Sequence, residues 1–503
     1  MKTNMKRIIA LFLIIWLLGG CGAAPQGVPD TIVIAQGVDA TTLDPHMHAE
    51  TTTANVVIQI FDRLFMRDDQ MVLQPHLAES GTAISDVLWE IRIKSGIQFH
   101  NGEPFNAESV KFSIERILDP ETKSPQISNL NFIEKVEVVD DLTVQITTKM
   151  PYPLTLSRLS LEMVPPGYIQ EHGQAYFAQH PVGTGPYRFV SWVRDEEVVL
   201  EANPDYWRGA PGIQHVKIRA IPENAVRIAA LQSGSVDVIV NVPPHQMETV
   251  SQADGCRIAS TQSGRFIFLQ IVADRGGMLG DPRVRQALNH AVDVPALIDT
   301  ILGGHGYRST QPLTSLDFGF DPAVTGFTYD PEKAKALLRE AGFPDGIDIQ
   351  LDAPSGRYAM DREVAEAIVG QMAVAGIRVN LVINEWGVHI KKLLDKQMTH
   401  MFFIGWGSSL FDADATLFPQ LRTGQRLTYF SNPAVDVLLD AGRSEMDPAA
   451  RGELYHEAVQ ILQQDPPFVL LYQQEDIYGA DDRLDWSPRP DELINVYQMK
   501  WKP

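Results

Sequence analysis

Apolar and polar positions alternate along the chain in two rhythms, one typical of strands and one typical of helices. Strand-like alternation occupies residues 31–35 and 89–93. A hairpin is predicted over 136–148, where Asp140 and Asp141 separate two alternating runs. These runs predict strands that lie among helices.

The expected helices alternate with the strands. Asp281 and Asp330 each precede a proline and then apolar residues at helical spacing, which is the pattern of an N-cap followed by a first helical turn. A third helix, 361–375, is followed by Gly376 and then by the alternating strand 377–383. A helix that leads into a strand through one glycine is typical of crossovers, so the sequence predicts an α/β fold.

The first residues follow a different pattern. Basic residues at positions 2, 6 and 7 precede an apolar run over 8–18, and two glycines then stand before Cys21. This is the pattern of a secretory signal peptide over 1–20, cut just before a cysteine whose thiol can be acylated, and it resembles a bacterial lipobox. The apolar run falls short of the ~20 residues that a membrane span requires.

Lipidation of Cys21 would hold the mature protein on a membrane, and the small, polar and proline-containing residues 21–29 would form a flexible tether. No second apolar run approaches membrane length. The remainder is therefore expected to be a soluble, extracytoplasmic domain, in the periplasm or at the cell surface.

Length, charge and cysteine content narrow the function further. A chain of 503 residues is too long for one core and suggests two or three lobes. A net charge of -21 argues against nucleic-acid binding, which needs a cationic face. Cys256 is the only cysteine besides Cys21, so no disulfide is expected. His46 and His48 lack companions at metal-ligand spacing, and neither a metal nor a cofactor is predicted.

Motifs of common enzyme classes are missing from the sequence, including Gly-x-Ser-x-Gly, the phosphate-binding P-loop and His-Glu-x-x-His. No catalytic residue is therefore assigned. A secreted hydrolase that uses Asp412 and Asp414 as an acid and base pair stays open as an alternative. Carboxylates two residues apart suit that role poorly, because they point to opposite faces of a strand or diverge on a helix.

Several blocks carry a resemblance to a known family. They are GIQFHNGEPF at 96–105, PVGTGPY at 181–187, NPDYW at 203–207, and the two helix regions 281–298 and 330–346. In this order and spacing the chain resembles the solute-binding proteins of peptide, nickel and glutathione ABC importers, over almost the whole mature length.

The resemblance implies a two-lobed periplasmic-binding-protein fold, or Venus-flytrap fold, with an extra subdomain inserted in the N-terminal lobe. Lobe I would combine 28–70, 183–264 and 475–503, the insert would be 71–182, and lobe II would be 265–474. The ligand would bind between the lobes, which close around it by hinge motion. The protein would act as a monomer.

A glycine-flanked tryptophan, Trp406, bears on the ligand. Di- and oligopeptide binders have a similar segment, in which an aspartate three residues after the tryptophan pairs with the peptide's α-amino group. Here that position is Ser409, which can hydrogen-bond an amine but cannot neutralise it. Trp406, Ser408 and Ser409 are expected to form one wall, and Asp412 or Asp414 to supply the missing anion. The alternative for Asp412 is a helix cap.

A second segment, 355–365, resembles the glutathione-binding branch of the family, as the Gly-Trp-Gly-Ser-Ser segment also does. Arg357 is expected to hold a ligand carboxylate through a bidentate fork, with Tyr358 beside it. Thr42 follows the first strand and is expected to line the cleft. The alternatives are that Arg357 is a solvated loop residue and that Thr42 belongs to an ordinary turn.

The sequence thus favours a lipid-anchored binding protein that delivers short peptides or peptide-like solutes, glutathione among them, to the permease subunits of an ABC importer. It would carry out no chemistry; binding would shift an equilibrium between open and closed forms. A nickel-chelate or haem carrier of the same fold is the alternative within this class, although histidines that could lie in the cleft are sparse.

Overall fold

The structure of the protein is a computed structural model, and it describes residues 29–408 and 410–502. The predicted signal peptide 1–20, the predicted lipidation site Cys21, the tether up to residue 28, and Ser409 lie outside the described residues. Within the described ranges, every helix falls short of the length or the apolar character that a bilayer span requires.

One large mixed sheet runs through most of the molecule. Its strand order is β15-β14-β16-β12-β17-β11-β1-β10-β9-β8, and β13 pairs with β17 beside this path. The strands are β1 Thr31–Gln36, β8 Tyr187–Val193, β9 Glu197–Ala202, β10 His215–Ala220, β11 Val238–Ile239, β12 Cys256–Ile271, β13 Gly306–Arg308, β14 Ile347–Ser355, β15 Ile377–Glu385, β16 Met401–Gly407 and β17 Phe468–Asp481.

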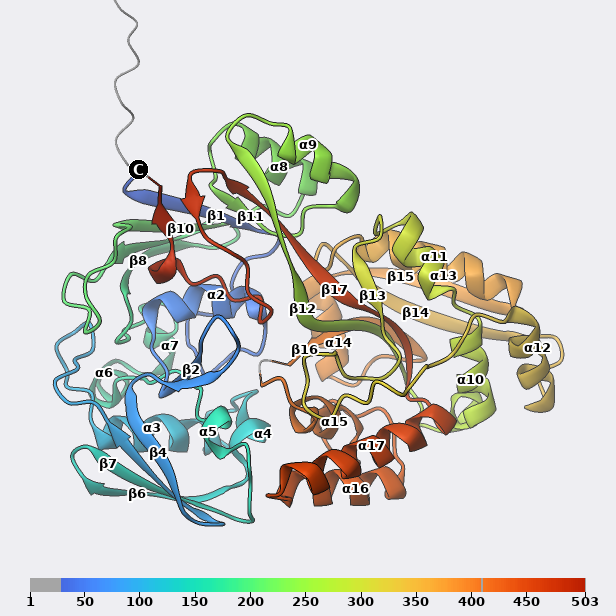
Figure 1. Ribbon diagram of the computed structural model, residues 1–503, viewed down its shortest axis with the longest axis horizontal. Coiled ribbons are helices and arrows are strands. Elements are labelled where there is room, and N and C mark those ends of the chain that lie inside the picture. Colours follow the sequence, from blue (N-terminus) through green and yellow to red (C-terminus); the bar gives the residue numbers. More distant parts are fainter. Residues whose placement is uncertain (1–28, 409, 503) are drawn as a thin grey trace, which may run out of the picture.

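The long antiparallel strands β12 and β17 join the two lobes. Figure 1 shows them running together across the middle of the molecule, from the part that holds β1 to the part that holds β14. Their pairing is interrupted between Gln262 and Phe266: residues 256–262 pair with 475–481 before the break, and residues 266–270 pair with 468–473 after it. A register break of this kind bends a strand, which suits a hinge.

A second sheet, with the order β4-β5-β7-β6, lies inside the predicted insert. Its strands are β4 Ala78–Ser85, β5 Leu88–Ile93, β6 Ile133–Asp140 and β7 Thr143–Thr148. The predicted hairpin is confirmed as β6 and β7, which turn at Asp141 and Leu142. Helix α3, Ala107–Leu118, covers this sheet, and the insert has a hydrophobic core of its own that includes Ile91, Val110 and Ile146.

Helices surround both sheets and add small pairings of strands. The helices are α2 Thr51–Ile60, α3 Ala107–Leu118, α4 Ile127–Leu130, α5 Thr155–Arg158, α6 Pro166–His172, α7 Gln174–Phe177, α8 Asn224–Gln232, α9 Met247–Ser251, α10 Pro282–His290, α11 Val294–Thr300, α12 Pro331–Glu340, α13 Asp361–Val374, α14 Trp386–Leu394, α15 Ala413–Leu421, α16 Pro433–Ser444 and α17 Pro448–Gln464. Short 3₁₀ turns and strands complete the set: η1 Pro244–Gln246, η2 Gly277–Gly280, η3 Val496–Gln498, β2 Phe65–Arg67, β3 Leu73–Pro75, β18 Leu484–Asp485 and β19 Lys500–Trp501.

The helix signals in the sequence are confirmed. The Asp281 side chain accepts a hydrogen bond from the backbone N–H of Arg283 and caps α10, and Asp330 caps α12 in the same way. Helix α13 ends at Val374, and Gly376 adopts a positive φ of 79° before β15 begins. The α/β fold class predicted from this pattern is therefore correct, whereas the residue limits given above for the lobes and the insert stay predictions.

Candidate functional site

A small cavity lies between the two lobes, next to the crossing of β12 and β17. Its volume is about 30 Å³, which admits a group of the size of a water molecule or an ammonium. Lobe I supplies most of the lining, and lobe II supplies Gly356 and Arg357. The full lining is Gln36, Gly37, Val38, Thr51, Thr52, Asn55, Val240, Asn241, Gly356, Arg357, Asp476, Tyr478 and Glu492.

The lobes approach each other closely around this cavity. Asn241 donates a hydrogen bond from its side-chain amide to the backbone carbonyl of Arg357 at 3.3 Å. Gly37 passes so near the other lobe that a Cβ atom there would lie 3.0 Å from the carbonyl oxygen of Gly356. The structure is therefore a closed arrangement of the two lobes.

Arg357 enters the cavity from lobe II, just after β14. Its backbone N–H donates to Asp361 at 3.0 Å, and its guanidinium lies over the rings of Tyr358 and Trp386, 4.9 and 5.6 Å from their centroids. The side chain is 7% exposed, yet its guanidinium makes no hydrogen bond within the described chain. Its one ion-pair contact there is with Glu492, at 3.8 Å. Arg357 is thus held in place and remains free to bind an anion.

Tyr358, the residue after Arg357, holds this turn in place. Its hydroxyl accepts a hydrogen bond from the backbone N–H of Gly405 at 2.9 Å, which joins the turn after β14 to the end of β16. The side chain is buried and does not line the cavity.

Glu492 already has a cation of its own. Arg265 donates to both of its carboxylate oxygens, from Nε at 2.5 Å and from the terminal nitrogen at 3.1 Å. The same guanidinium donates to the hydroxyl of Thr51 and to the carbonyl of Gly405, each at 3.1 Å. Burial alone would raise the pKa of Glu492, but Arg265, and then Arg357, hold it below its ordinary value.

Asp476 has no such partner. It lies on β17 with 4% of its surface exposed, and it lines the cavity. One carboxylate oxygen accepts a hydrogen bond from the amide of Gln474, whereas the other is buried and accepts none in the part of the chain that is described. The nearby hydroxyl of Ser263 donates to Glu492 at 3.2 Å. Burial, and then repulsion from Glu492, raise the pKa of Asp476 to about 8.

The wall expected from the Gly-Trp segment lies at the end of β16. Trp406 pairs with Phe266 of β12 and is half-buried, and its indole N–H is enclosed without an acceptor among the described residues. Ser408 is buried, and its hydroxyl likewise has no hydrogen-bond partner in the described chain. Neither side chain lines the cavity that holds Arg357 and Asp476. Both retain unmet hydrogen-bonding capacity near the lobe interface.

Asp412 and Asp414 are both engaged with arginines. Asp412 caps α15, and Arg451 donates to its two oxygens at 2.7 and 2.6 Å. Asp414 accepts from the hydroxyl of Tyr152 at 2.6 Å and from Arg158 at 3.3 Å, so it joins lobe II to the insert. An ammonium could reach the carboxylate of Asp412 only by displacing Arg451. The second oxygen of Asp414 accepts no hydrogen bond among the described residues, but Arg443 lies 3.7 Å from it and already supplies a positive charge there.

Thr42 lies in the turn between β1 and α2, where its hydroxyl accepts from the backbone N–H of Asp44 at 3.1 Å. The residues of this region that line the cavity are instead 36–38, Thr51, Thr52 and Asn55. Sequence reasoning missed them, and it missed Asp476 and Glu492 as well. A usable signal existed for Asp476, because it ends a run of four polar residues, 473–476, between two apolar parts of β17, and such a run inside a strand is uncommon without a functional or pairing role.

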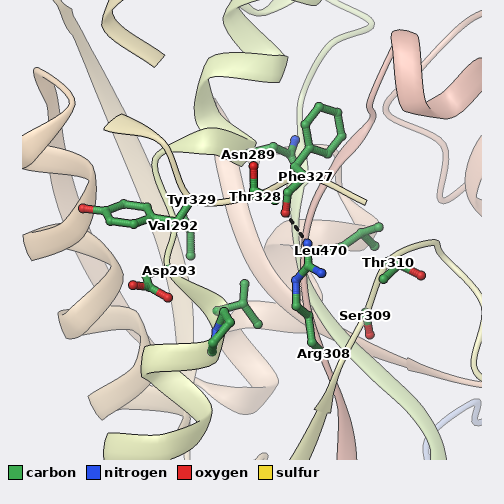
Figure 2. A pocket seen from close by; sticks show the side chains of 12 residues that line it. Asn289, Val292, Asp293, Arg308, Ser309, Thr310, Phe327, Thr328, Tyr329 and Leu470 are labelled. Carbon is green, nitrogen blue, oxygen red and sulfur yellow. Dashed lines mark hydrogen bonds between the residues drawn. The ribbon is translucent and has the colours of Figure 1, made fainter. Parts of the chain in front are cut away.

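A larger cavity, of about 180 Å³, lies within lobe II beside α10, α11 and β13. Figure 2 shows Arg308 directed towards the backbone of 327–328, with Asp293 and Tyr329 on the other side of the space. Arg308 donates to the carbonyls of Thr325, at 3.1 Å, and Phe327. None of the described lining side chains has a buried polar atom without a partner. We therefore place the candidate ligand site between the lobes.

Comparison with known proteins finds matches over most of the chain. The model of the bacterial extracellular solute-binding proteins, family 5 (middle region), matches residues 72–427. The glutathione-binding protein GsiB of Pectobacterium atrosepticum is 30% identical over 494 residues, which cover 94% of each chain.

Solved structures of similar proteins include AgaA and NikZ. AgaA from A. tumefaciens in complex with agropinic acid is 27% identical, with a TM-score of 0.85 over 94% of this chain and 99% of that one. NikZ from Campylobacter jejuni in complex with Ni(L-His) is 25% identical, with a TM-score of 0.85 and the same coverage. DppA from Helicobacter pylori in complex with the peptide STSA, at 24% identity and a TM-score of 0.88, shows likeness of the fold alone.

Proposed function

We propose, because the chain belongs to family 5 of the bacterial extracellular solute-binding proteins, that it captures a short peptide or peptide-like solute and delivers it to an ABC importer. The family and the two-lobed fold are those of binding proteins, which act through closure and not through bond chemistry.

One observation carries the proposal: the guanidinium of Arg357 is buried at the lobe interface, stacked on two aromatic rings, and without a hydrogen bond in the described chain. A buried guanidinium gains most from a carboxylate that accepts two parallel hydrogen bonds. A carboxylate-bearing solute therefore fits this site. We propose that Trp406, Ser408 and Ser409 form a further wall for the rest of the solute.

The names of the relatives suggest which solutes to try first. Glutathione is the first candidate, because relatives that match 93–94% of this chain are called glutathione-binding proteins. An opine is a second candidate and a nickel chelate a third, since AgaA and NikZ were solved with agropinic acid and Ni(L-His). All three contain carboxylate groups, which Arg357 would bind.

Lipidation of Cys21 would place the protein where the permease lies. A tether over 21–29 would then confine the loaded protein to the membrane and raise its effective concentration at the importer. Replacing Cys21 with serine is expected to move the protein from the membrane fraction to the soluble extracytoplasmic fraction. Retention of the Cys21→Ser variant in the membrane fraction would count against the lipid anchor.

Titration calorimetry of the mature protein tests the binding function. We expect tight binding of glutathione or of a small peptide, and binding weaker by at least about tenfold in Arg357→Lys, because lysine cannot form the bidentate fork. Arg362→Lys is the matched control, since Arg362 is 60% exposed and pairs with Glu366 on the surface of α13. Silence across peptides, opines and nickel chelates would overturn the proposal.

A further inference from the structure

Of the four charged side chains that the structure describes beside the interlobe cavity, only two form a hydrogen-bonded ion pair with each other. Arg265 and Glu492 neutralise each other through two hydrogen bonds. Arg357 and Asp476 remain, one on each lobe, and both line the same cavity. Neither forms a hydrogen-bonded ion pair within the described residues. The closed site therefore presents one cation and one carboxyl group whose charges need partners.

Of these two side chains, Asp476 has the greater need for a partner, because its carboxylate is buried. Its carboxylate has left water almost completely, and one oxygen has no donor. A buried carboxylate in this situation is stabilised either by a proton or by a cation that enters the site, because isolated burial of the charge is very unfavourable. The cavity beside Asp476, at about 30 Å³, is large enough for one ammonium group.

Resting on the proposed function, we propose that Asp476 pairs with an ammonium of the ligand while Arg357 holds a carboxylate of it, so that the ligand bears both a free amine and a carboxylate. Both residues line the same cavity, one from each lobe. The γ-glutamyl end of glutathione is a ligand group of the required class.

This assignment also accounts for Ser409. The aspartate that peptide binders carry at this position is unnecessary when the anion comes from β17 of lobe I. Asp412 and Asp414 then keep their arginine partners. The pKa of Asp476, raised to about 8 by burial and by Glu492, adds a consequence: at neutral pH an arriving ammonium displaces a proton from the carboxyl group.

The test uses two ligands, glutathione and N-acetylglutathione. They differ in the charge on the α-amino group of the γ-glutamyl residue, which acetylation removes. Both are tested with the mature chain and with two variants. Asp476→Asn removes the charge and keeps the shape, and Asp482→Asn makes the same change at an exposed residue just beyond β17. Calorimetry is run at pH 7 in two buffers of different ionisation enthalpy, and thermal unfolding checks that each variant is folded. We expect glutathione to bind Asp476→Asn at least about tenfold more weakly than wild type.

N-acetylglutathione is expected to bind the wild type and Asp476→Asn with equal, low affinity, and Asp482→Asn is expected to match the wild type. The wild type should release a proton on binding glutathione, and Asp476→Asn should not. Equal binding of glutathione by the wild type and a folded Asp476→Asn, or equal losses for both probes, would overturn the assignment alone. Silence of the wild type towards every solute in the wider panel would overturn it together with the proposed function.

Discussion

Arg265 and Glu492 form a buried ion pair beside the register break of β12, where the two lobes meet. The guanidinium donates to both carboxylate oxygens, at 2.5 and 3.1 Å, and the two side chains are 9% and 11% exposed. Arg265 also bonds Gly405 of lobe II, and Ser263 at the break donates to Glu492. The pair therefore fixes the C-terminal segment to the hinge, and each member neutralises the other in a place where little water reaches.

Replacing Glu492 with glutamine is expected to lower the free energy of unfolding by about 3 to 5 kcal/mol, because the buried charge of Arg265 then loses its partner. Urea unfolding of the ligand-free protein measures the change. Glu137→Gln is the control: Glu137 pairs with Lys135 on an exposed face of the insert, and its loss is expected to change stability by less than about 1 kcal/mol. Equal effects of the two substitutions would show that the hinge pair adds nothing to stability.

Gly264 lies inside the register break and should be sensitive to any side chain. A Cβ atom there would stand 2.7 Å from the ring of Phe411 and 3.3 Å from the carbonyl oxygen of Pro490. Gly264→Ala is therefore expected to disfavour the closed form and to raise the Kd for glutathione by about tenfold, which is about 1.4 kcal/mol. Calorimetry gives the Kd, and small-angle scattering should show that adding glutathione compacts the variant less than the wild type.

Gly280→Ala provides the comparison for this change. Gly280 has open space around its Cα, and an added methyl group meets no atom within 4 Å. The affinity and the scattering profile of that variant should match those of the wild type. If Gly264→Ala also leaves both unchanged, the close packing of the hinge against Phe411 has no influence on closure.

Local patterns in the sequence were sufficient to predict much of the fold. The strands at 31–35 and 89–93 and the hairpin at 136–148 are present, because alternation and turn residues act over a few neighbouring positions. The family resemblance, based on short blocks, is confirmed by the family match. Helices capped by Asp281 and Asp330 follow for the same local reason.

The charge pairs of the site could not be predicted in this way. Arg265 and Glu492 are 227 positions apart in the sequence, and Arg158 and Asp414 are 256 apart. Which arginine neutralises which carboxylate depends on how the lobes and the insert come together, and no periodicity records that. The candidate anions of the Gly-Trp segment therefore looked free in the sequence, although both have arginine partners in the structure. Asp476 lies in a polar run inside β17, but the sequence does not show that this run reaches the interface between the lobes.

Tyr152 links the insert to lobe II through the carboxylate of Asp414. Burial raises the pKa of Tyr152, so its hydroxyl stays protonated and donates at 2.6 Å, while Arg158 donates to that hydroxyl at 3.0 Å. Tyr152→Phe removes both hydrogen bonds and is expected to weaken glutathione binding about fivefold or more, by about 1 to 3 kcal/mol, since the contact favours closure. Calorimetry measures the loss. Tyr307→Phe, at a residue that is 48% exposed, should have no effect.

The raised pKa of Asp476 predicts how stability depends on pH. Burial and the carboxylate of Glu492 raise this pKa from its ordinary value of 3.8 to about 8, while the hydroxyl of Ser263, the amide of Gln474 and then the guanidinium of Arg265 act against the shift. Tyr478 and Arg357 complete the charged and titratable lining of the cavity around Asp476. Between these two pKa values the folded protein holds a proton at Asp476 that the unfolded chain has lost. The stabilisation from that proton is complete below pH 3.8 and is lost as the pH rises towards 8.

The free energy of unfolding of the ligand-free wild type should therefore fall with rising pH relative to that of Asp476→Asn, by up to about 1.4 kcal/mol per pH unit. Urea unfolding of both proteins at intervals between pH 5 and pH 9 measures the difference. Burial raises the pKa of Asp317 to about 7, so Asp317 also makes stability depend on pH. Both proteins retain Asp317, so its contribution to the free energy of unfolding cancels in the difference. A constant difference across this range would mean that Asp476 stays ionised in the folded protein, and a neighbouring cation would then have to be sought for it.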